Sequence, residues 1–342
     1  MSMSADYAVL QSAAVLFDRS DRMRMRILGA KAAELITGLV TNDVLSLQPG
    51  DGQYAAALTP KGKILADLNI FAMEDGLLLD TSARAAPGLR EMIRKFVNPR
   101  VAVYRDITEK TADITLAGNG ARLIASRMSG VPGETLGALP AFAHLRFRSD
   151  DILATAPDDD DRFAMVTRMP DLDTECYSLI FPAALREEFT RSLLRFGAVH
   201  GSPALWQTLR IEAGRPEWGA DMNDSTLPQE ANFDELGAIS YTKGCYVGQE
   251  TVARIHFRGH VNRFLRKVKF LCGAPPPSGA QLVDDDGQPV GELRSTAISP
   301  RQGGIGIAMV RREVAVGTSL EAKWEGGSCT VQVTANEKGA TI

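Results

Sequence analysis

A cysteine flanked by glycines and charged residues is the strongest chemical signal in this sequence. Residues 243–250 read Lys-Gly-Cys-Tyr-Val-Gly-Gln-Glu, and Arg254 follows them closely. Because glycine has no Cβ, the two glycines would allow a turn that presents the Cys245 thiol to solvent. Positive charge on Lys243 and Arg254 would favour the thiolate, the form of cysteine that acts as a nucleophile or a metal ligand. The segment predicts a reactive thiol, and the alternative is an ordinary buried cysteine.

Two carboxylates stand among apolar residues, where an unpaired charge is costly to bury. Asp67 interrupts the apolar stretch 64–73, and Glu212 follows two leucines on one stripe of a predicted helix. Each carboxylate therefore needs a partner. The alternative to a functional Asp67 is a strand-edge position that faces water. For Glu212 the alternative is a buried ion pair with Arg210 or Arg215.

The composition is that of an ordinary globular protein. The chain has 342 residues, of which 44% are hydrophobic and 23% are charged, so it could form two or three domains. With 38 Lys and Arg against 42 Asp and Glu the formal charge is −4, and we expect no direct contact with nucleic acid. We expect no membrane segment, because no stretch approaches the roughly 18 apolar residues that a spanning helix needs. Residues 1–16 do not have the pattern of a secretory signal.

The cysteine spacing indicates reduced thiols. The four cysteines lie far apart and form no Cys-x-x-Cys pair: Cys176, Cys245, Cys272 and Cys329. We therefore expect no disulfide and a cytoplasmic location.

Two groups of possible ligands do not predict a permanent metal site. Cys245, His256 and His260 could be combined into a three-ligand site. However, their cationic neighbours oppose a cation, and residues 257–259 would interrupt the helix that places both imidazoles on one face. The acidic run 157–161 predicts a solvated loop, because consecutive carboxylates cannot all converge on one ion.

Hydrophobic periodicity predicts a mixture of strands and helices. Residues 22–28 alternate between basic and apolar side chains, which is typical of a strand with one buried face. Other predicted strands are 53–59, 64–73, 77–80, 101–107, 114–117, 163–168 and 177–181, and the predicted helices are 30–39, 88–96, 118–127, 183–196 and 203–213. Short strands at 264–271, 281–283, 291–295, 304–310 and 328–333 predict a small antiparallel barrel.

Several of these segments resemble one family. Lys-Gly-Cys-Tyr-x-Gly-Gln-Glu at 243–250, followed by Val-Ala-Arg and Phe-Arg-Gly, is similar to the signature of the YgfZ family. These proteins are folate-binding relatives of the glycine cleavage T-protein and include the mitochondrial iron-sulfur cluster assembly factor. Arg-Ile-Glu-Ala-Gly at 210–214 resembles the T-protein segment whose glutamate holds the folate pterin.

The resemblance implies an α+β, T-protein-like multi-domain folate-binding fold with a C-terminal antiparallel β-barrel. The body would comprise residues 1–260, as two intertwined subdomains of about 1–110 with 200–260, and 111–199. The barrel would comprise residues 261–342. The implied cofactor is tetrahydrofolate or another folate derivative.

Three residues would address the folate in such a fold. Glu212 would hold the pterin, whose two parallel N–H donors suit a carboxylate as a guanidinium does. Trp206 would contact the folate, and its alternative role is that of a core aromatic. Asp67 would be the one remaining acid of two successive aspartates that the T-protein carries at this place.

The same resemblance assigns roles in the thiol segment. Cys245 would be the reactive group, with Lys243 and Arg254 tuning it and Gln249 and Glu250 fixing the loop. Thiolate is the usual ligand of iron-sulfur clusters, so a transient cluster contact through this thiol is expected in place of a permanent metal.

The resemblance implies a tetrahydrofolate-binding factor that supports assembly or repair of [4Fe-4S] proteins, including radical enzymes that modify tRNA. Its partners would be iron-sulfur assembly proteins or client enzymes, and no reaction has to be catalysed. One alternative is a folate-dependent aminomethyl or one-carbon transferase. Against it, Thr174-Glu175-Cys176 stands where the T-protein has a Gly-Glu-Asp-Gly-type turn. Another alternative is a folate sensor or storage module with a structural cysteine.

Overall fold

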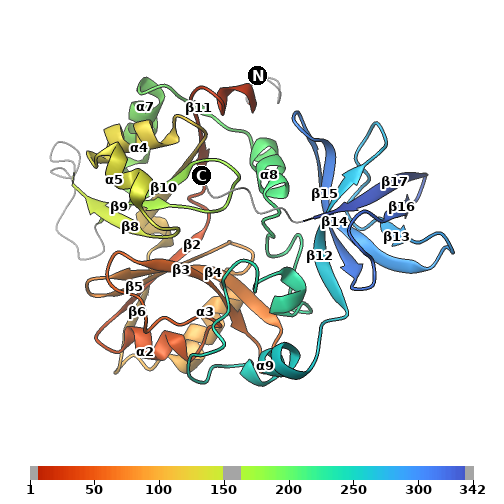
Figure 1. The fold of residues 1–342 in the computed structure, drawn as a ribbon. Coiled ribbons are helices and arrows are strands. Elements are labelled where there is room, and N and C mark those ends of the chain that lie inside the picture. Colours follow the sequence, from red (N-terminus) through yellow and green to blue (C-terminus); the bar gives the residue numbers. More distant parts are fainter. Residues whose placement is uncertain (1–6, 149–162, 336–342) are drawn as a thin grey trace.

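The computed structural model describes residues 7–148 and 163–335. Two sheets with their helices form a body, and a β-barrel lies beside it, with helix α8 between them (Figure 1). The acidic run predicted at 157–161 lies outside the described residues. In the part of the chain that is described, no helix has both the length and the apolar character needed to cross a membrane.

The lower sheet of the body is antiparallel, with strand order β3-β4-β5-β2-β6. Its strands are β2 (Met23–Leu28), β3 (Gly52–Leu58), β4 (Ile64–Met73), β5 (Gly76–Thr81) and β6 (Val103–Asp106). Helices α2 (Ala32–Thr37) and α3 (Ala86–Phe96) contribute buried residues to the core on one face. A short 3-10 helix, η1 (Thr108–Lys110), leads to the upper sheet.

The prediction of a single buried face for residues 22–28 is wrong, because both faces of β2 are buried. Arg24 is fully buried, and its guanidinium donates to Thr111 Oγ1 at 2.7 Å and to the carbonyl oxygen of Thr111 at 3.0 Å. Thr111 begins the upper sheet, so the second face of β2 lies against that sheet instead of water. Hydrogen bonds of this kind make burial of a charged side chain tolerable.

The upper sheet has the strand order β11-β1-β7-β10-β9-β8. Strands β1 and β11 are parallel, and the other pairs are antiparallel. The strands are β1 (Ala14–Asp18), β7 (Thr111–Ala117), β8 (His144–Phe147), β9 (Ala164–Arg168), β10 (Cys176–Pro182) and β11 (Ala198–His200). The accompanying helices are α4 (Ala121–Ser129), α5 (Gly133–Ala138), η2 (Ala183–Leu185) and α7 (Arg186–Arg195).

Six antiparallel strands close the C-terminal barrel, in the order β12-β15-β14-β13-β16-β17. They are β12 (Arg263–Phe270), β13 (Gln281–Val283), β14 (Pro289–Ser299), β15 (Gly303–Arg311), β16 (Ser319–Trp324) and β17 (Gly327–Thr334). The α+β fold class with a C-terminal antiparallel barrel is confirmed. The periodicity analysis missed β16, which pairs with both β13 and β17 and thereby closes the barrel.

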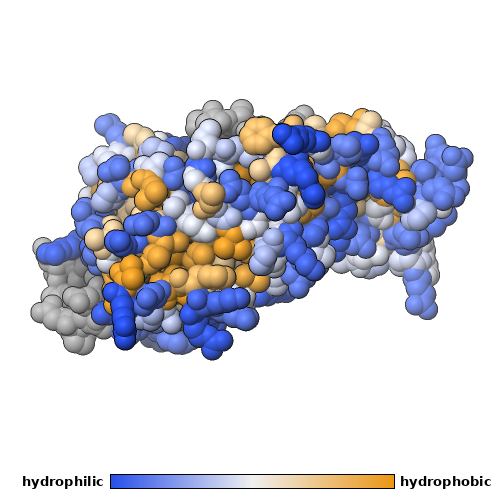
Figure 2. Space-filling view, turned by 90° about the horizontal axis from the view of Figure 1, so that it is seen from below, coloured by the Kyte–Doolittle hydropathy of each residue, from blue (hydrophilic) through white to orange (hydrophobic). Residues whose placement is uncertain are grey.

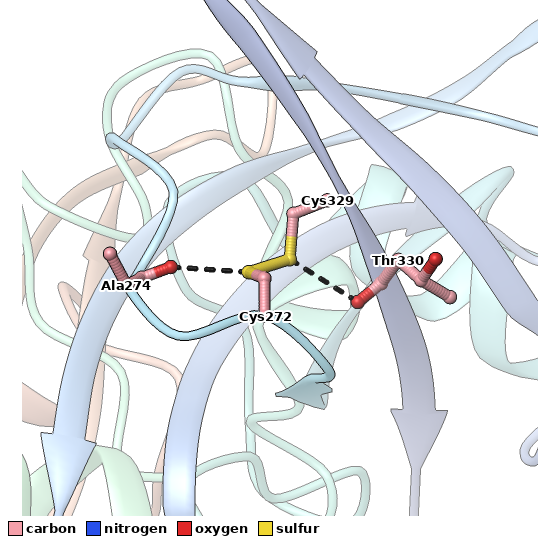
Figure 3. The surroundings of a disulfide bond; sticks show 4 residues. All are labelled: Cys272, Ala274, Cys329 and Thr330. Atoms are coloured by element: carbon pink, nitrogen blue, oxygen red, sulfur yellow. Dashed lines mark hydrogen bonds between the residues drawn. A yellow bond between two sulfur atoms is a disulfide. The ribbon is translucent and has the colours of Figure 1, made fainter.

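The expectation of four reduced thiols is wrong for the barrel, where Cys272 and Cys329 form a disulfide (Figure 3). The two residues are 57 positions apart in sequence. Strands β12 and β17 nevertheless pair, and the N–H of Leu271 donates to the carbonyl oxygen of Thr330 at 3.0 Å. Closure of the barrel brings the cysteines together, which their spacing could not reveal. A disulfide is an argument against the predicted cytoplasmic location, which stays a prediction.

His144 of β8 lies where the two sheets meet. Its ring packs edge-on against Phe71 of β4, with ring centroids 5.7 Å apart, and the backbone N–H of His144 donates to the carbonyl oxygen of Gly50 at 2.8 Å. The side chain is only 3% exposed, and burial lowers the pKa of His144 to about 4, although Asp51 opposes this shift. The neutral imidazole is therefore part of the packing between the sheets.

This position predicts a stability change with pH. In the unfolded chain His144 takes up a proton near pH 6.5, whereas the folded protein resists it down to about pH 4. The free energy of unfolding should therefore fall as pH falls through this window, by about 2 kcal/mol at pH 5. Urea unfolding at pH 7 and pH 5 measures the fall in the free energy of unfolding between the two pH values. This fall should be about 2 kcal/mol smaller in His144→Phe than in the wild type. The exposed His200, changed to Gln, is the control; an unchanged pH dependence in His144→Phe would contradict the assignment.

Candidate functional site

A cavity lies between the lower sheet, the segment that joins β1 to β2, and helix α8 (Pro203–Glu212) with the loop that follows it. Ser202 caps this helix by accepting a hydrogen bond from the N–H of Leu205 at 3.1 Å. We call the cavity the Asp67 pocket. Its lining residues are Arg19, Arg22, Tyr54, Asp67, Asn69, Ser82, Asp171, Trp206, Arg210, Arg215, Pro216, Glu217 and Trp218. Charged groups of both signs thus surround a small space with tryptophans at its margin.

Asp67 lies on β4, which pairs with β3 on one side and β5 on the other. The strand-edge alternative is therefore wrong. The hydroxyl of Tyr54 donates to Asp67 Oδ2 at 2.8 Å, while Oδ1 is buried without a hydrogen-bond partner among the described residues. Burial raises the pKa of Asp67, and the Tyr54 hydroxyl and nearby arginines only partly offset this. The carboxyl thus has one oxygen held and one oxygen available.

Two other polar atoms in the lining are buried without partners within the described part of the chain: Asn69 Oδ1 and Trp218 Nε1. The Asn69 amide donates from its Nδ2 to Asp80 Oδ2 at 3.0 Å, which fixes the orientation of the side chain. Unsatisfied buried polar atoms are rare in folded proteins and call for an explanation. Here an acid oxygen, an amide oxygen and an indole N–H all belong to one cavity, as in a site that awaits a polar ligand.

Arginines pair with acids around the rest of the pocket. Arg22 forms a bidentate pair with Asp80, with a shortest N–O distance of 2.7 Å. Asp171 lies 3.2 Å from Arg215 and 3.6 Å from Arg19. The sequence analysis did not name Asp171 as a site residue. Asp171 lies three residues before Thr174-Glu175-Cys176, the segment that differs from the T-protein turn. An acidic residue close to this segment was a signal that could have indicated it.

Trp206 lies between the core and the Asp67 pocket. The guanidinium of Arg19 lies 4.0 Å from the indole centroid, and the ring of Phe17 packs edge-on at 5.2 Å. The side chain therefore packs against the core on one side and lines the Asp67 pocket on the other. A contact between Trp206 and folate stays a prediction.

Glu212, at the end of α8, lies outside the pocket lining and is only 2% exposed. Its carboxylate accepts hydrogen bonds from the hydroxyl of Tyr7, at 2.9 Å, and from Ser299, and it lies 3.5 Å from the guanidinium of Arg301. These contacts tie the N-terminal segment and the barrel to α8. A pterin contact by Glu212 stays a prediction, and it would require one of these partners to release the carboxylate.

Arg210 does not pair with Glu212 as the alternative supposed. Its guanidinium donates to Asp221 Oδ2 at 2.6 Å and to the hydroxyl of Ser295 at 2.7 Å, and Ser295 donates to Asp221 Oδ1 at 2.6 Å. Arg210 and Asp221 are 3% and 0% exposed in their side chains. Because Ser295 belongs to β14, this closed network fastens the barrel to a helix that also lines the pocket.

The thiol loop, residues 241–248, places Cys245 in solvent as a free cysteine. The buried-cysteine alternative is therefore wrong. Lys243 donates from Nζ to the carbonyl oxygens of Val40 at 2.7 Å and Asn42 at 2.9 Å, and also to Thr37. Its ammonium lies 4.8 Å from the ring centroid of Tyr246, and burial lowers its pKa to about 8. Lys243 anchors the loop to the end of α2, and its predicted influence on the thiol stays a prediction.

Gly248 fixes the other end of the thiol loop. It has a positive φ of 82° and precedes helix α9 (Gln249–Arg258). A Cβ on Gly248 would lie 2.6 Å from the carbonyl oxygen of Thr59 and 3.1 Å from the Cα of Gly62. The loop therefore sits directly on the turn of the β3–β4 hairpin. Gly244 has no positive φ, and a Cβ there would meet no described atom within 4 Å, so only Gly248 needs to be glycine.

As predicted, the helix ends within residues 257–259: α9 stops at Arg258 and Gly259 is extended, so His260 lies outside the helix that carries His256. Gln249 Oε1 accepts from the N–H of Tyr246 at 3.4 Å, which agrees with a role in fixing the loop. Glu250 and Arg254 are exposed. The described residues contain no group of three or more His, Cys, Asp and Glu placed to hold a metal ion.

One hairpin connects the pocket and the thiol loop. The 3-10 helix η3 (Pro228–Ala231) and the connection after it bring the chain from α8 to the thiol loop. Asp67 lies five residues beyond Gly62 on β4, which corresponds to roughly 17 Å along the strand. Cys245 is absent from the lining of the pocket, so the pocket and the thiol loop are two sites on one scaffold.

Comparison with known proteins gives two regions of similarity. Residues 1–239 match the family model of the GCVT N-terminal domain, and residues 265–338 match that of the CAF17 C-terminal beta-barrel domain. The segment between them, residues 240–264, holds the thiol loop and α9.

Individual proteins agree with these matches. The chain is 30% identical to a tRNA-modifying protein YgfZ of Hamiltonella defensa over 69% of this chain and 64% of that protein, so it spans about two thirds of that relative's length. It is 26% identical to an aminomethyltransferase of Chlorobium chlorochromatii over 90% of this chain and 82% of that protein. The structure of aminomethyltransferase T from Bartonella henselae superposes with a TM-score of 0.85 at 19% identity, covering 99% and 90% of the two chains, which shows a shared fold.

The two glycines of the thiol loop provide a matched test of its contact with the β3–β4 turn. Gly248→Ala should lower the free energy of unfolding by about 1–3 kcal/mol, because it adds a side chain at positive φ and against the hairpin turn. Gly244→Ala should stay within about 0.5 kcal/mol of the wild type, as an open surface substitution does. Urea unfolding measures both values. Equal effects of the two substitutions would show that the loop does not rest on the hairpin as described.

Proposed function

Because this chain belongs to the GCVT N-terminal domain family and ends in a CAF17-type β-barrel, we propose that it binds a reduced folate in the Asp67 pocket and supports assembly or repair of [4Fe-4S] proteins through Cys245. The observation that carries the folate part is the set of unsatisfied polar atoms that Asp67, Asn69 and Trp218 contribute to one cavity. The exposed thiol carries the second part.

The polar groups of the pocket suit a pterin. A pterin carries N–H and amino donors, which Asp67 Oδ1 and Asn69 Oδ1 can accept, and ring nitrogen and oxygen acceptors for the indole N–H of Trp218. The enclosed volume is only about 40 Å³, enough for a few water molecules. Binding therefore requires movement of side chains at the margin, and the half-buried Trp206 and Trp218 are the candidates. A bound tetrahydrofolate would supply a carrier for one-carbon units.

Asp67 has a defined part in this proposal. Burial favours its neutral form, and the Tyr54 hydroxyl holds Oδ2, so Oδ1 can either donate or accept a hydrogen bond at the ligand. The ring of Tyr54 is itself held by the guanidinium of Arg215, 3.9 Å from the ring centroid. The acid is thereby oriented before any ligand arrives.

Cys245 has the exposure that exchange with another protein requires. Thiolate is the usual ligand of iron-sulfur clusters, so a cluster in transit or under repair would be cargo at this thiol. The related protein named for tRNA modification is one reason to include radical tRNA-modifying enzymes among the proposed clients. Lys243 and Gly248 would hold the loop in place while a client docks.

One observation favours a second function, folate-dependent one-carbon transfer. Asp171 comes from the loop that replaces the T-protein turn and lines the same pocket as Asp67. The pocket lining therefore holds the acids Asp67, Asp171 and Glu217, and a transferase would need acids there for proton transfer. Formation of a one-carbon folate product that is unaffected by Cys245→Ala would favour this function over cluster maintenance.

The folate proposal predicts the effect of Asp67→Asn. The amide keeps the size of the side chain but replaces one carboxyl oxygen by an NH₂ group, so it cannot present an acceptor to both Tyr54 and the ligand. Tetrahydrofolate should therefore bind at least ten-fold more weakly, the loss expected for one hydrogen bond in a buried site. Quenching of tryptophan fluorescence during titration with tetrahydrofolate measures this. Glu212→Gln is measured in the same way. Weaker binding in Asp67→Asn alone would place the folate in the Asp67 pocket, and weaker binding in Glu212→Gln would support the predicted pterin contact of Glu212. Wild-type affinity in both variants would refute folate binding by these acids.

The cluster proposal predicts the effect of Cys245→Ser in cells. In cells without this gene and under oxidative stress, the wild type should restore the activity of a [4Fe-4S] enzyme, and Cys245→Ser should not. Gly244→Ala, in the same loop and sterically free, is the control and should restore activity fully. Protein amounts are matched by immunoblot. Equal rescue by Cys245→Ser would remove the thiol from the proposal.

A further inference from the structure

Exposed arginines gather where helix α9 meets the barrel. Arg254 and Arg258 lie one turn apart on α9, and Arg311 and Arg312 lie at the end of β15; all four are exposed. Among the described residues, none of them takes part in an ion pair. We call this surface the α9–barrel patch and include Phe257, whose side chain is 67% exposed.

The backbone shows that the two arginine pairs are close. The N–H of Arg312 donates to the carbonyl oxygen of Asn262 at 3.0 Å, and Asn262 lies only four residues after Arg258. Four residues span at most about 14 Å. Asn262, Arg311 and Arg312, together with Glu313, also line a shallow hollow in the surface. The end of α9 and the end of β15 thus lie within a short length of chain of each other.

The local charge is positive although the whole chain carries −4. The exposed acids of this surface include Glu250, in the first turn of α9, Glu313, and Asp234, which accepts a hydrogen bond from the hydroxyl of Tyr241. Arg263, at the start of β12, is already paired with Glu230 at 2.9 Å and adds no free charge. Four guanidiniums without ion pairs among the described residues therefore stand against these three carboxylates, one of which is engaged by Tyr241. On the face seen from below, the barrel half is mainly hydrophilic, and the apolar area lies on the body (Figure 2).

An exposed aromatic ring stands among these charges. The imidazole of His256 stacks on Tyr241 with centroids 3.6 Å apart, and Phe257 meets His256 edge-on at 4.7 Å. These contacts hold Phe257 in place from one side and leave most of its ring in solvent. A supported, exposed ring beside unpaired guanidiniums is the arrangement that binds single-stranded nucleic acid, with stacking on bases and ion pairs to phosphates.

We propose that the α9–barrel patch binds a single-stranded segment of nucleic acid, with Phe257 stacked on an unpaired base and the four arginines contacting phosphates. This revises the expectation of no direct contact with nucleic acid, which rested on the net charge of the chain. Nucleic acid is favoured over an acidic protein because it can use both features of the patch: its phosphates pair with the arginines and a base stacks on Phe257. An acidic protein would use only the arginines.

The test uses the full-length protein and labelled, unstructured RNA and DNA oligonucleotides of the same sequence, about 20 nucleotides long. Fluorescence anisotropy at about 50 and 200 mM salt gives the affinity and its salt dependence. Arg258→Glu should weaken binding at least ten-fold and reduce the slope of log K against log salt by about 0.7, the value for one phosphate contact. Phe257→Ala should weaken binding about five-fold or more and leave the slope unchanged.

Arg127→Glu, an exposed arginine of α4 on the far side of the body (Figure 1), is the matched control and should bind as the wild type does. Thermal melts confirm that each variant is folded. A preference for RNA or DNA identifies the natural ligand. Absence of wild-type binding at low salt, an equal loss in Arg127→Glu, or equal competition by polyglutamate would overturn the proposal. Folate titration is a separate readout, so failure here leaves the proposed function untouched.

Discussion

The close approach of Gly248 to the β3–β4 hairpin is the constraint on which both candidate sites depend. The thiol loop rests on the hairpin turn at Gly62, with no room for a side chain at Gly248. The two strands of the same hairpin carry Tyr54 and Asp67, whose hydrogen bond orients the acid in the pocket. Because interiors are closely packed, a shift of this hairpin would move the thiol and the acid together. The hairpin is therefore one direct physical connection between the pocket and the thiol loop.

Buried guanidiniums explain how the three parts of the molecule fit together. Arg24 joins the lower sheet to the upper sheet, and Arg210 joins α8 to the barrel through Asp221 and Ser295. A charge that is buried in a low-dielectric interior needs partners with good geometry. Removal of one partner leaves an uncompensated buried charge, which strongly lowers the free energy of unfolding. These networks therefore specify one arrangement of the parts. They also place α8 between the pocket and the barrel, so that Glu212 serves the junction with the barrel.

Local patterns in the sequence were sufficient for much of the fold and for part of the site. The apolar run with a proline-glycine turn before it gave β4 with its bounds, and Pro203 marked the start of α8. Non-local features could not be read in this way. The disulfide depends on the closure of the barrel, and the two buried faces of β2 depend on a second sheet. Asp171 lies in the loop between β9 and β10, and the packing of this loop places it in the pocket lining. Loops have no hydrophobic periodicity, so the sequence pattern could not predict this position.

Two domain models cover the framework of this molecule, and the connection between them holds the thiol loop and α9. The two matched regions end at residue 239 and begin again at 265, and the thiol loop and α9 lie between them. That connection has a free thiol, an exposed ring and arginines without acidic partners in the described structure. Such side chains gain little by packing, so folding alone does not account for them. Loops and connections on a rigid scaffold are where binding groups concentrate, so we expect the exposed groups of this connection to act in binding, while the two matched regions hold it in position.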